Sequence, residues 1–372
     1  MSNRNSVLFF TFFMIFVYGK IYSQELYPQS LLWEVTGNNI KSASYLYGTI
    51  HIWDKRVFEL NDSVISAILN SDIFAAEINF DSVNVELTNS LISNNYDRIN
   101  LIEILSQEEI DSLNSVTKKM LGKSLKELNN LDARSVLYEF EKEEIQIDMP
   151  YPLDIFLYKI AKSNGKKIDA LENLTEHLNL LLDTNKDELR DYLINIINDT
   201  SYVSFKLENL ISKYLNANLT GISEYLKEWN VNNLDYRDKI FKKRNIAMAK
   251  KIDELVPNSS VFFAMGCGHL PGQDGLINLL QEKGYNVRPI FCDKTELVNT
   301  YLPDKIDLPW IKYVPAGGGF EVDIPGNPTP LGEQDQVASV ITESAVYNDI
   351  IKKTAYVVSK SEYATSIRKK SI

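Results

Sequence analysis

Two short motifs place a histidine three residues after a glycine. They are "GTIH", from Gly48 to His51, and "GCGH", from Gly266 to His269, and they use two of the three histidines in the chain. Neutral imidazole is a common ligand of zinc and related divalent metals in proteins. The repeated local setting of these two residues favours the hypothesis that both histidines serve one site.

A third candidate ligand, Glu77, lies within the apolar stretch "FAAEINF" (74–80). Burying a carboxylate among apolar residues costs free energy unless the charge is paired or bound to a cation. Two histidines and one glutamate form a common catalytic metal set, which leaves a coordination position open for water. We therefore expect His51, Glu77 and His269 to bind a divalent metal.

A metal-free interpretation of the motifs stays open at this stage. A histidine at the end of a strand is often a hydrogen-bonded structural residue, so the chain could be an α/β protein with packed histidines. The third histidine, His177, shares a helical face with leucines of "LTEHLNLLL" (174–182). That pattern predicts a partly buried packing residue rather than a ligand.

The elements that must position these residues follow from the hydrophobic pattern. Near-continuous apolar runs predict strands at 43–50, 72–80, 166–171, 260–267 and 285–292. Helical periodicity lies between them, for example at 152–166 and 272–285. This alternation predicts an α/β fold with a mostly parallel central sheet, whose carboxyl edge would carry His51, Glu77 and His269. The segments 84–145 and 173–255 are predicted to be large helical insertions.

One predicted helix, 236–255, directs polar side chains inward. Its apolar stripe includes Arg244 and Asn245 together with Phe241 and Met248. An inward guanidinium needs an anionic partner, which would be a protein carboxylate or a substrate. The alternative is an arginine whose apolar stem packs at the core edge while its charge reaches water.

The N-terminus has the pattern of a secretory signal peptide. Arg4 precedes a twelve-residue apolar run, "VLFFTFFMIFVY" (7–18), and a cleavage site is predicted after Ser23. An uncleaved membrane anchor is the alternative, although twelve residues are few for a span. We expect an exported protein, periplasmic or extracellular.

Composition narrows the possible partners. The chain of 372 residues carries a formal net charge of −11, which argues against binding to a nucleic-acid backbone.

The two cysteines, Cys267 and Cys292, end apolar runs, so they are either a pair across neighbouring strands or two buried free thiols. Proline and glycine enrichment predicts a linker at 294–318, after the main domain at 24–293, and a short appendage at 319–372.

Several of these stretches together resemble the TraB/GumN family, which includes the TIKI metalloproteases and is related in fold to erythromycin-esterase-like proteins. "YLYGTIH", "FAAEINF", "FKKRNIAMAKKI" and "GCGHLPGQDGLINLLQEKGY" carry the resemblance, which covers roughly 27–292. It implies a metal site of His51, Glu77 and His269, holding manganese or cobalt rather than zinc.

The resemblance extends to four further polar residues. Arg244 and Asn245 match the family's Arg-Asn pair, and Asp154 and Glu172 lie at matching positions. His177 stands where many members carry glutamine, which supports its structural interpretation.

The sequence therefore predicts an exported metal-dependent hydrolase that acts on peptide bonds of a peptide or protein substrate, with Mn, Co or Zn as cofactor. If Glu77 is a ligand, Glu172 is the candidate base, and Arg244 would hold a substrate carboxylate or stabilise an oxyanion. The alternative is a protein of the same fold that binds a metal, a peptide or a pheromone without turnover.

Overall fold

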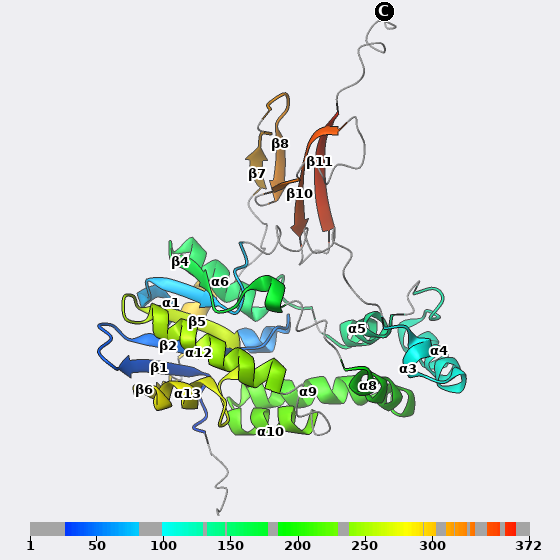
Figure 1. Cartoon of the computed structure of the whole chain (residues 1–372), viewed down its shortest axis with the longest axis horizontal. Helices are drawn as coiled ribbons and strands as arrows, with labels where there is room; N and C mark the ends of the chain where they lie inside the picture. The colour runs from blue at the N-terminus through cyan, green and yellow to red at the C-terminus, as the bar shows by residue number, and fades with distance from the viewer. Residues whose placement is uncertain are drawn as a thin grey trace, which may run out of the picture.

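The computed structural model describes residues 27–81, 99–128, 132–145, 147–177, 185–229, 238–292, 294–302, 310–315, 317–325, 328–331, 341–349 and 354–361 (Figure 1). The predicted signal peptide, 1–23, lies outside these ranges. None of the helices in the described ranges is long and apolar enough to cross a membrane.

A six-stranded sheet forms the centre of the molecule, in the order β4-β3-β5-β2-β1-β6. The strands are β1 (Leu32–Gly37), β2 (Ser44–Thr49), β3 (Ile73–Ala76), β4 (Lys167–Ala170), β5 (Val261–Gly266) and β6 (Tyr285–Pro289). The pairs β2–β5, β3–β5 and β3–β4 are parallel, whereas β1 runs antiparallel to both of its neighbours. The predicted fold class, an α/β fold with a mostly parallel sheet, is confirmed.

The antiparallel strand β1 is the strand of the central sheet that the hydrophobic runs did not indicate. Its buried residues Leu32, Trp33 and Val35 are interrupted by the partly exposed Glu34, as in a strand with one solvated face. A turn with positive φ at Gly37 (81°) and at the two asparagines that follow then returns the chain into β2. Such a hairpin needs no crossover helix, so it leaves no strand-helix alternation in the sequence.

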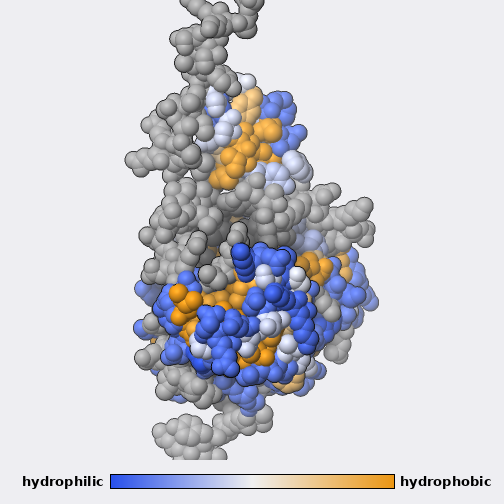
Figure 2. All heavy atoms as spheres, turned by 90° about the vertical axis from the view of Figure 1, so that its right-hand side faces the viewer, coloured by the Kyte–Doolittle hydropathy of each residue, from blue (hydrophilic) through white to orange (hydrophobic). Residues whose placement is uncertain are grey.

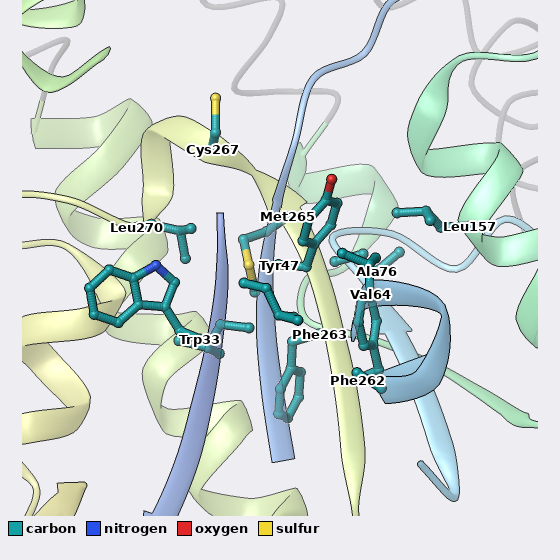
Figure 3. Close-up of a cluster of buried hydrophobic side chains, with 14 of the residues drawn as sticks. Trp33, Tyr47, Val64, Ala76, Leu157, Phe262, Phe263, Met265, Cys267 and Leu270 are labelled. Atoms are coloured by element: carbon teal, nitrogen blue, oxygen red, sulfur yellow. The ribbon is translucent and has the colours of Figure 1, made fainter. Parts of the chain in front are cut away.

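Helices cover the sheet and complete its core. They include α1 (Asp62–Asn70), α6 (Leu153–Ser163), α12 (Arg244–Leu255) and α13 (Leu276–Glu282). Figure 3 shows Trp33, Tyr47 and Phe262 from three strands packing with Val64 of α1 and Leu157 of α6. Because this core surrounds the strands on both sides, the polar residues at the strand ends are held by a rigid frame.

The predicted helical insertions build a second core beside the sheet. The helices α3 (Leu101–Ile104), α4 (Gln107–Leu121), α5 (Ala133–Glu144) and α8 (Lys186–Asn198) lie together at one end of the molecule (Figure 1). Their buried residues, such as Leu113, Phe140 and Leu193, form a cluster separate from that of the sheet. The helices α9 (Tyr202–Leu215) and α10 (Leu219–Trp229) then lead back to the main core.

The C-terminal part consists of short antiparallel strands. These are β7 (Trp310–Tyr313) and β8 (Val322–Pro325), which pair with each other, and β9 (Thr329–Leu331), β10 (Ile341–Asp349) and β11 (Thr354–Ser361), which form a three-stranded sheet. Figure 2 shows apolar side chains gathered on one face of this part. Trp310 and Val357 are more than half exposed.

The structure adds detail to the boundaries predicted for the linker and the appendage. Val298, in the short helix η4 (Leu297–Thr300), is 2% exposed and belongs to the main core. β7 lies within the predicted linker 294–318 but pairs with β8 of the predicted appendage. The first residues of the predicted linker therefore pack with the main domain, and its last residues with the C-terminal strands.

Candidate metal centre

The two glycine-histidine motifs touch each other. β2 and β5 are parallel neighbours, and Thr49 pairs with Gly266, so both motifs leave the sheet at the same edge. A Cβ atom on Gly48 would lie 2.9 Å from Leu270 Cδ1 and 3.0 Å from Cys267 Cα. Only glycine fits at this position, because any side chain would push the second motif away from the first. The shared setting of His51 and His269 thus reflects direct packing between their loops.

Glu77 comes to the same edge from β3, the other neighbour of β5. It follows the last residue of the strand and is 7% exposed. Its Oε1 accepts a hydrogen bond from the Gly266 backbone N–H at 2.6 Å. The same oxygen lies 3.8 Å from His51 Nε2 and 3.9 Å from His269 Nε2. The structure therefore brings the three predicted ligands together around one carboxylate oxygen.

His269 is buried and held in one tautomer. Its Nδ1 lies 2.6 Å from Asn245 Oδ1, while the Asn245 amide nitrogen donates to the Asp274 carbonyl at 2.7 Å. Because Asn245 Oδ1 is an acceptor, Nδ1 carries the proton and Nε2 keeps a lone pair that faces Glu77. Burial lowers the pKa of His269 to about 4, so the ring is neutral at physiological pH.

His51 lies at the solvent-facing side of the centre, with its side chain 55% exposed. Its Nδ1 is 3.2 Å from Asp154 Oδ1, a buried oxygen that makes no hydrogen bond of good geometry within the described residues. Partial loss of hydration opposes a positive charge on this ring, but Asp154 and then Glu77 raise its pKa well above the usual value.

Both histidines thus share one arrangement. Nδ1 is directed to a fixed oxygen, and Nε2 is directed to Glu77. Metal-binding histidines in proteins are commonly oriented in this way, with the second ring nitrogen bound to a carboxylate or carbonyl oxygen.

Arg244 joins two carboxylates of the centre, Glu77 and Glu172. Its Nε donates to Glu172 Oε1 at 2.7 Å, and its Nη2 lies 2.6 Å from Glu172 Oε2 and 2.7 Å from Glu77 Oε2. Burial opposes ionisation of Glu77, but His51, His269 and Arg244 together lower its pKa well below the usual value. Glu77 is therefore a carboxylate whose two oxygens face different partners, the histidines on one side and the guanidinium on the other.

The third histidine also joins the centre, contrary to its predicted packing role. His177 Nδ1 lies 2.9 Å from Glu172 Oε2 and 3.2 Å from Arg244 Nη2. Its side chain is 14% exposed, so it is partly buried as predicted, but among charges rather than on a leucine stripe. No local pattern indicated this contact, because the leucine spacing around His177 predicted only packing and nothing in it pointed to Glu172 or Arg244.

The contacts of Arg244 and Glu172 differ from the roles predicted for them. The inward orientation expected for Arg244 and Asn245 is present, at 8% and 2% exposure. The anionic partners of Arg244 are two protein carboxylates, so a substrate carboxylate is not needed to balance its charge. Burial opposes ionisation of Glu172, but Arg244 and His177 lower its pKa. A carboxylate held in this way is a weak base.

A one-turn change of helix geometry places these residues. The segment η2 (Asp238–Lys243) is a π-helix that continues directly into α12 at Arg244. π-turns shift the register of a helix and are frequent at functional sites. Here the turn sets Phe241 against the His269 ring, with ring centroids 5.4 Å apart, while Arg244 and Asn245 follow on the inward face.

The donor types fit a divalent metal, although the ligand atoms of His51, Glu77 and His269 do not all lie within 4.8 Å of one another. A Cβ atom on Gly266 would lie 3.2 Å from Glu77 Oε1, 3.6 Å from His51 Nε2 and 3.8 Å from His269 Cδ2. The bare glycine thus leaves room among the three ligands. Burial raises the pKa of the nearby Cys267 thiol to about 12 in the metal-free protein, which keeps this thiol protonated there. Both cysteines are free thiols.

The family to which the chain belongs is consistent with such a centre. Residues 31–289 match the model of the TraB/PrgY/gumN family, so the chain is a member of that family, as its motifs indicated. It is 26% identical over 164 residues to a protein named Metalloprotease TIKI2 from Danio rerio, covering 36% of this chain and 32% of that protein.

Two further relatives carry similar names. Metalloprotease TIKI1 from Xenopus tropicalis matches with the same identity and coverage. The Metalloprotease TIKI homolog from Amphimedon queenslandica is 26% identical over 192 residues, covering 43% of this chain and 36% of that protein. The chain thus spans about a third of the length of these relatives. No solved structure gives a significant match.

Proposed function

We propose that the protein is an exported metal-dependent hydrolase that acts on peptide bonds, with a divalent ion (Mn, Co or Zn) held by His51, Glu77 and His269. The observation that carries the proposal is the common orientation of the two histidines. Each has Nδ1 directed to a fixed oxygen, on Asp154 or Asn245, and Nε2 directed to Glu77 Oε1. The names of the TIKI relatives favour peptide or protein substrates.

The residues around the proposed metal have separate roles in holding its ligands and in admitting substrate. When bound, the metal would supply Lewis acidity to a scissile carbonyl and to the attacking water. Arg244 and the Gly266 N–H hold the two oxygens of Glu77 and keep it ionised. Asn245 and Asp154 are positioning residues that fix the two imidazole rings. Because His51 is the exposed member of the set, substrate would approach from its side.

One observation favours a non-catalytic metal- or peptide-binding protein as the second candidate. Catalysis needs a proton acceptor besides the ligands. The two other carboxylates nearby are both engaged, Glu172 with Arg244 and His177, and Asp154 with His51. In a hydrolase, Glu77 or Asp154 would therefore have to accept the proton. Glu77 would then be both a metal ligand and the base, or Asp154 would both position His51 and act as the base.

Metal analysis and a cleavage assay separate the candidates. Purified protein is supplied with Mn²⁺, Co²⁺ or Zn²⁺, dialysed, and analysed for metal per chain, and the loaded protein is then tested on a peptide library with and without chelator. A hydrolase cleaves only when loaded, and a binding protein holds metal without cleavage. His51→Ala and His269→Ala should each lose the metal, whereas His177→Ala is the matched control that keeps it. Wild type that never holds metal would refute the hydrolase and the metal-binding protein, and would leave only a protein that binds peptide without metal.

Export is the part of the proposal that rests on sequence alone. The charged residue Arg4, the apolar run 7–18 and the predicted cleavage after Ser23 support it. The mature chain should begin near Gln24 and fractionate with the periplasm or the medium. N-terminal sequencing that finds Met1 or Ser2 on the soluble protein would contradict export by this route.

A further inference from the structure

A second group of metal-ligand residues lies behind the proposed metal site. One oxygen of Glu77, one oxygen of Glu172 and one ring nitrogen of His177 all lie within 4.8 Å of one another, which is metal-ligand spacing. Two carboxylates and an imidazole form a set that divalent metals accept. Within the part of the chain that the structure describes, it is the one group of three with this spacing, which the set of His51, Glu77 and His269 does not reach.

The space within this group already holds a cation. Arg244 Nη2 lies 2.7 Å from Glu77 Oε2, 2.6 Å from Glu172 Oε2 and 3.2 Å from His177 Nδ1. All four side chains are largely buried, with exposures between 8% and 14%. Two buried carboxylates require a compensating positive charge, and a planar guanidinium with several donors can meet both of them at once.

Glu77 is common to both groups. Its Oε1 faces His51 and His269, whereas its Oε2 faces Arg244. A carboxylate that bridges two ions in this manner is a familiar part of two-metal hydrolytic sites. Here the second ion would be replaced by the guanidinium.

We propose that Arg244 is the built-in second cation of the centre, so that the protein binds one metal ion where its ligands would otherwise accommodate two. The proposal deepens the proposed function and builds on its metal site, but it predicts the behaviour of Arg244 variants independently. Arg244 then has no direct contact with substrate and is a positioning residue for Glu77.

The test compares Arg244→Ala with Arg244→Lys. Each protein is loaded with Mn²⁺ alone, dialysed, analysed for metal, and examined by electron paramagnetic resonance. Wild type and Arg244→Lys, which keep a cation at this position, should hold the same amount of Mn²⁺. Arg244→Ala should hold about twice as much, with the spectrum of two exchange-coupled ions because Glu77 would bridge them. Adding His177→Ala to Arg244→Ala should remove the extra ion and the coupling.

Folding provides a second readout. In chelator, Arg244→Ala leaves Glu77 and Glu172 buried without a counter-charge, so it should melt well below wild type. Mn²⁺ or Zn²⁺ should then raise its melting temperature by more than it raises that of wild type. If wild type holds two coupled ions, if folded Arg244→Ala gains none, or if unfolded Arg244→Ala is not restored by either metal, the proposal is wrong. If wild type and Arg244→Lys hold one ion and Arg244→Ala holds two coupled ions, but none of these proteins cleaves peptides, the hydrolase proposal fails while this one stands.

Discussion

His51, His177 and His269 lie within one cluster of charges, yet each has a different environment. His269 faces Glu77 but is buried against Asn245 and Phe241, and its pKa is lowered to about 4. His51 is more than half exposed, and Asp154 and Glu77 raise its pKa well above the usual value although partial loss of hydration opposes this. The two histidines that we propose as metal ligands therefore differ in the pH at which each ring is neutral and able to bind a metal.

This difference is measurable because the chain has only three histidines. In metal-free protein, a proton NMR titration should show three Hε1 ring signals, one for each histidine and each assigned by its alanine variant. The His51 signal should titrate well above pH 6.5, and the His269 signal should not titrate until about pH 4. Both signals titrating near 6.5 would contradict the burial and charge pairing described above.

The pKa shifts of His269 and His51 make folding stability depend on pH in opposite directions. The lowered pKa of His269 means that the unfolded chain binds more protons, so its contribution is present above pH 6.5 and is lost as pH falls to about 4. At one pKa unit per 1.4 kcal/mol, the loss is about 3 kcal/mol. The raised pKa of His51 stabilises the metal-free fold below pH 6.5, and this contribution is lost as pH rises through that pKa. Melting temperatures of wild type and His269→Ala between pH 6.5 and about pH 4 test whether the contribution of His269 is lost as the pH falls.

The residues that orient the histidines should affect metal affinity almost as much as the proposed ligands do. Asn245→Ala removes the partner of His269 Nδ1, and Asp154→Asn removes the charge beside His51 Nδ1. Each should weaken metal binding by roughly 10- to 100-fold without abolishing it. Asp81→Asn is the matched control, because Asp81 bonds Tyr158 and Lys162 of the same helix α6 but has no contact with the centre. Competition titration against a chelating dye gives the affinities, and an unchanged value for Asn245→Ala would refute the positioning role.

At the scale of elements, the sequence predicted what short-range patterns encode. Strands β2, β3 and β5 are near-continuous apolar runs, and the carboxyl edge of these strands brings His51, Glu77 and His269 together. β1 was missed because its alternating pattern belongs to a hairpin. The partnership of His177 with Arg244 was missed because it joins residues 67 positions apart through a π-turn that no local pattern encodes.

The contact between the two motif loops allows a test at this scale. Gly48→Ala would place a methyl group 3.0 Å from the Cys267 backbone and push the loop of His269 away from β2. Overpacking of this kind should cost about 1–3 kcal/mol of stability and sharply reduce metal binding. Gly122→Ala is the control. Gly122 has a φ of 67°, and a Cβ atom added there would have no other part of the described chain within 4 Å. This variant should lose about 1 kcal/mol of stability through backbone strain and keep the metal. Equal metal content in the two variants would contradict the role of the loop contact.

For the whole molecule, the centre depends on the sheet core rather than on the C-terminal strands. Its ligands and their partners come from β2, β3, β5 and from the helices α6 and α12, all within the residues that match the family model, 31–289. The strands from β7 onward follow that region. The main core nevertheless continues past it, because Val298 is buried, Tyr301 and Leu302 pack on its surface, and Asp62 accepts a hydrogen bond from the Leu297 N–H at 2.7 Å.

Two truncations can therefore locate the end of the main domain. A chain that ends after Leu302 should unfold cooperatively and keep wild-type metal content, because it retains both hydrophobic clusters and the whole centre. A chain that ends after Cys292 loses the burial of Val298, which is worth about 1.5–3 kcal/mol for such a side chain. It should melt roughly 3–12 °C lower than the longer chain, at about 2–4 °C per kcal/mol for a domain of this size. Thermal unfolding of the two proteins in the same buffer measures the difference. Loss of a cooperative transition in the longer chain would show that the C-terminal strands are part of the core, and equal melting temperatures would show that η4 contributes nothing to it.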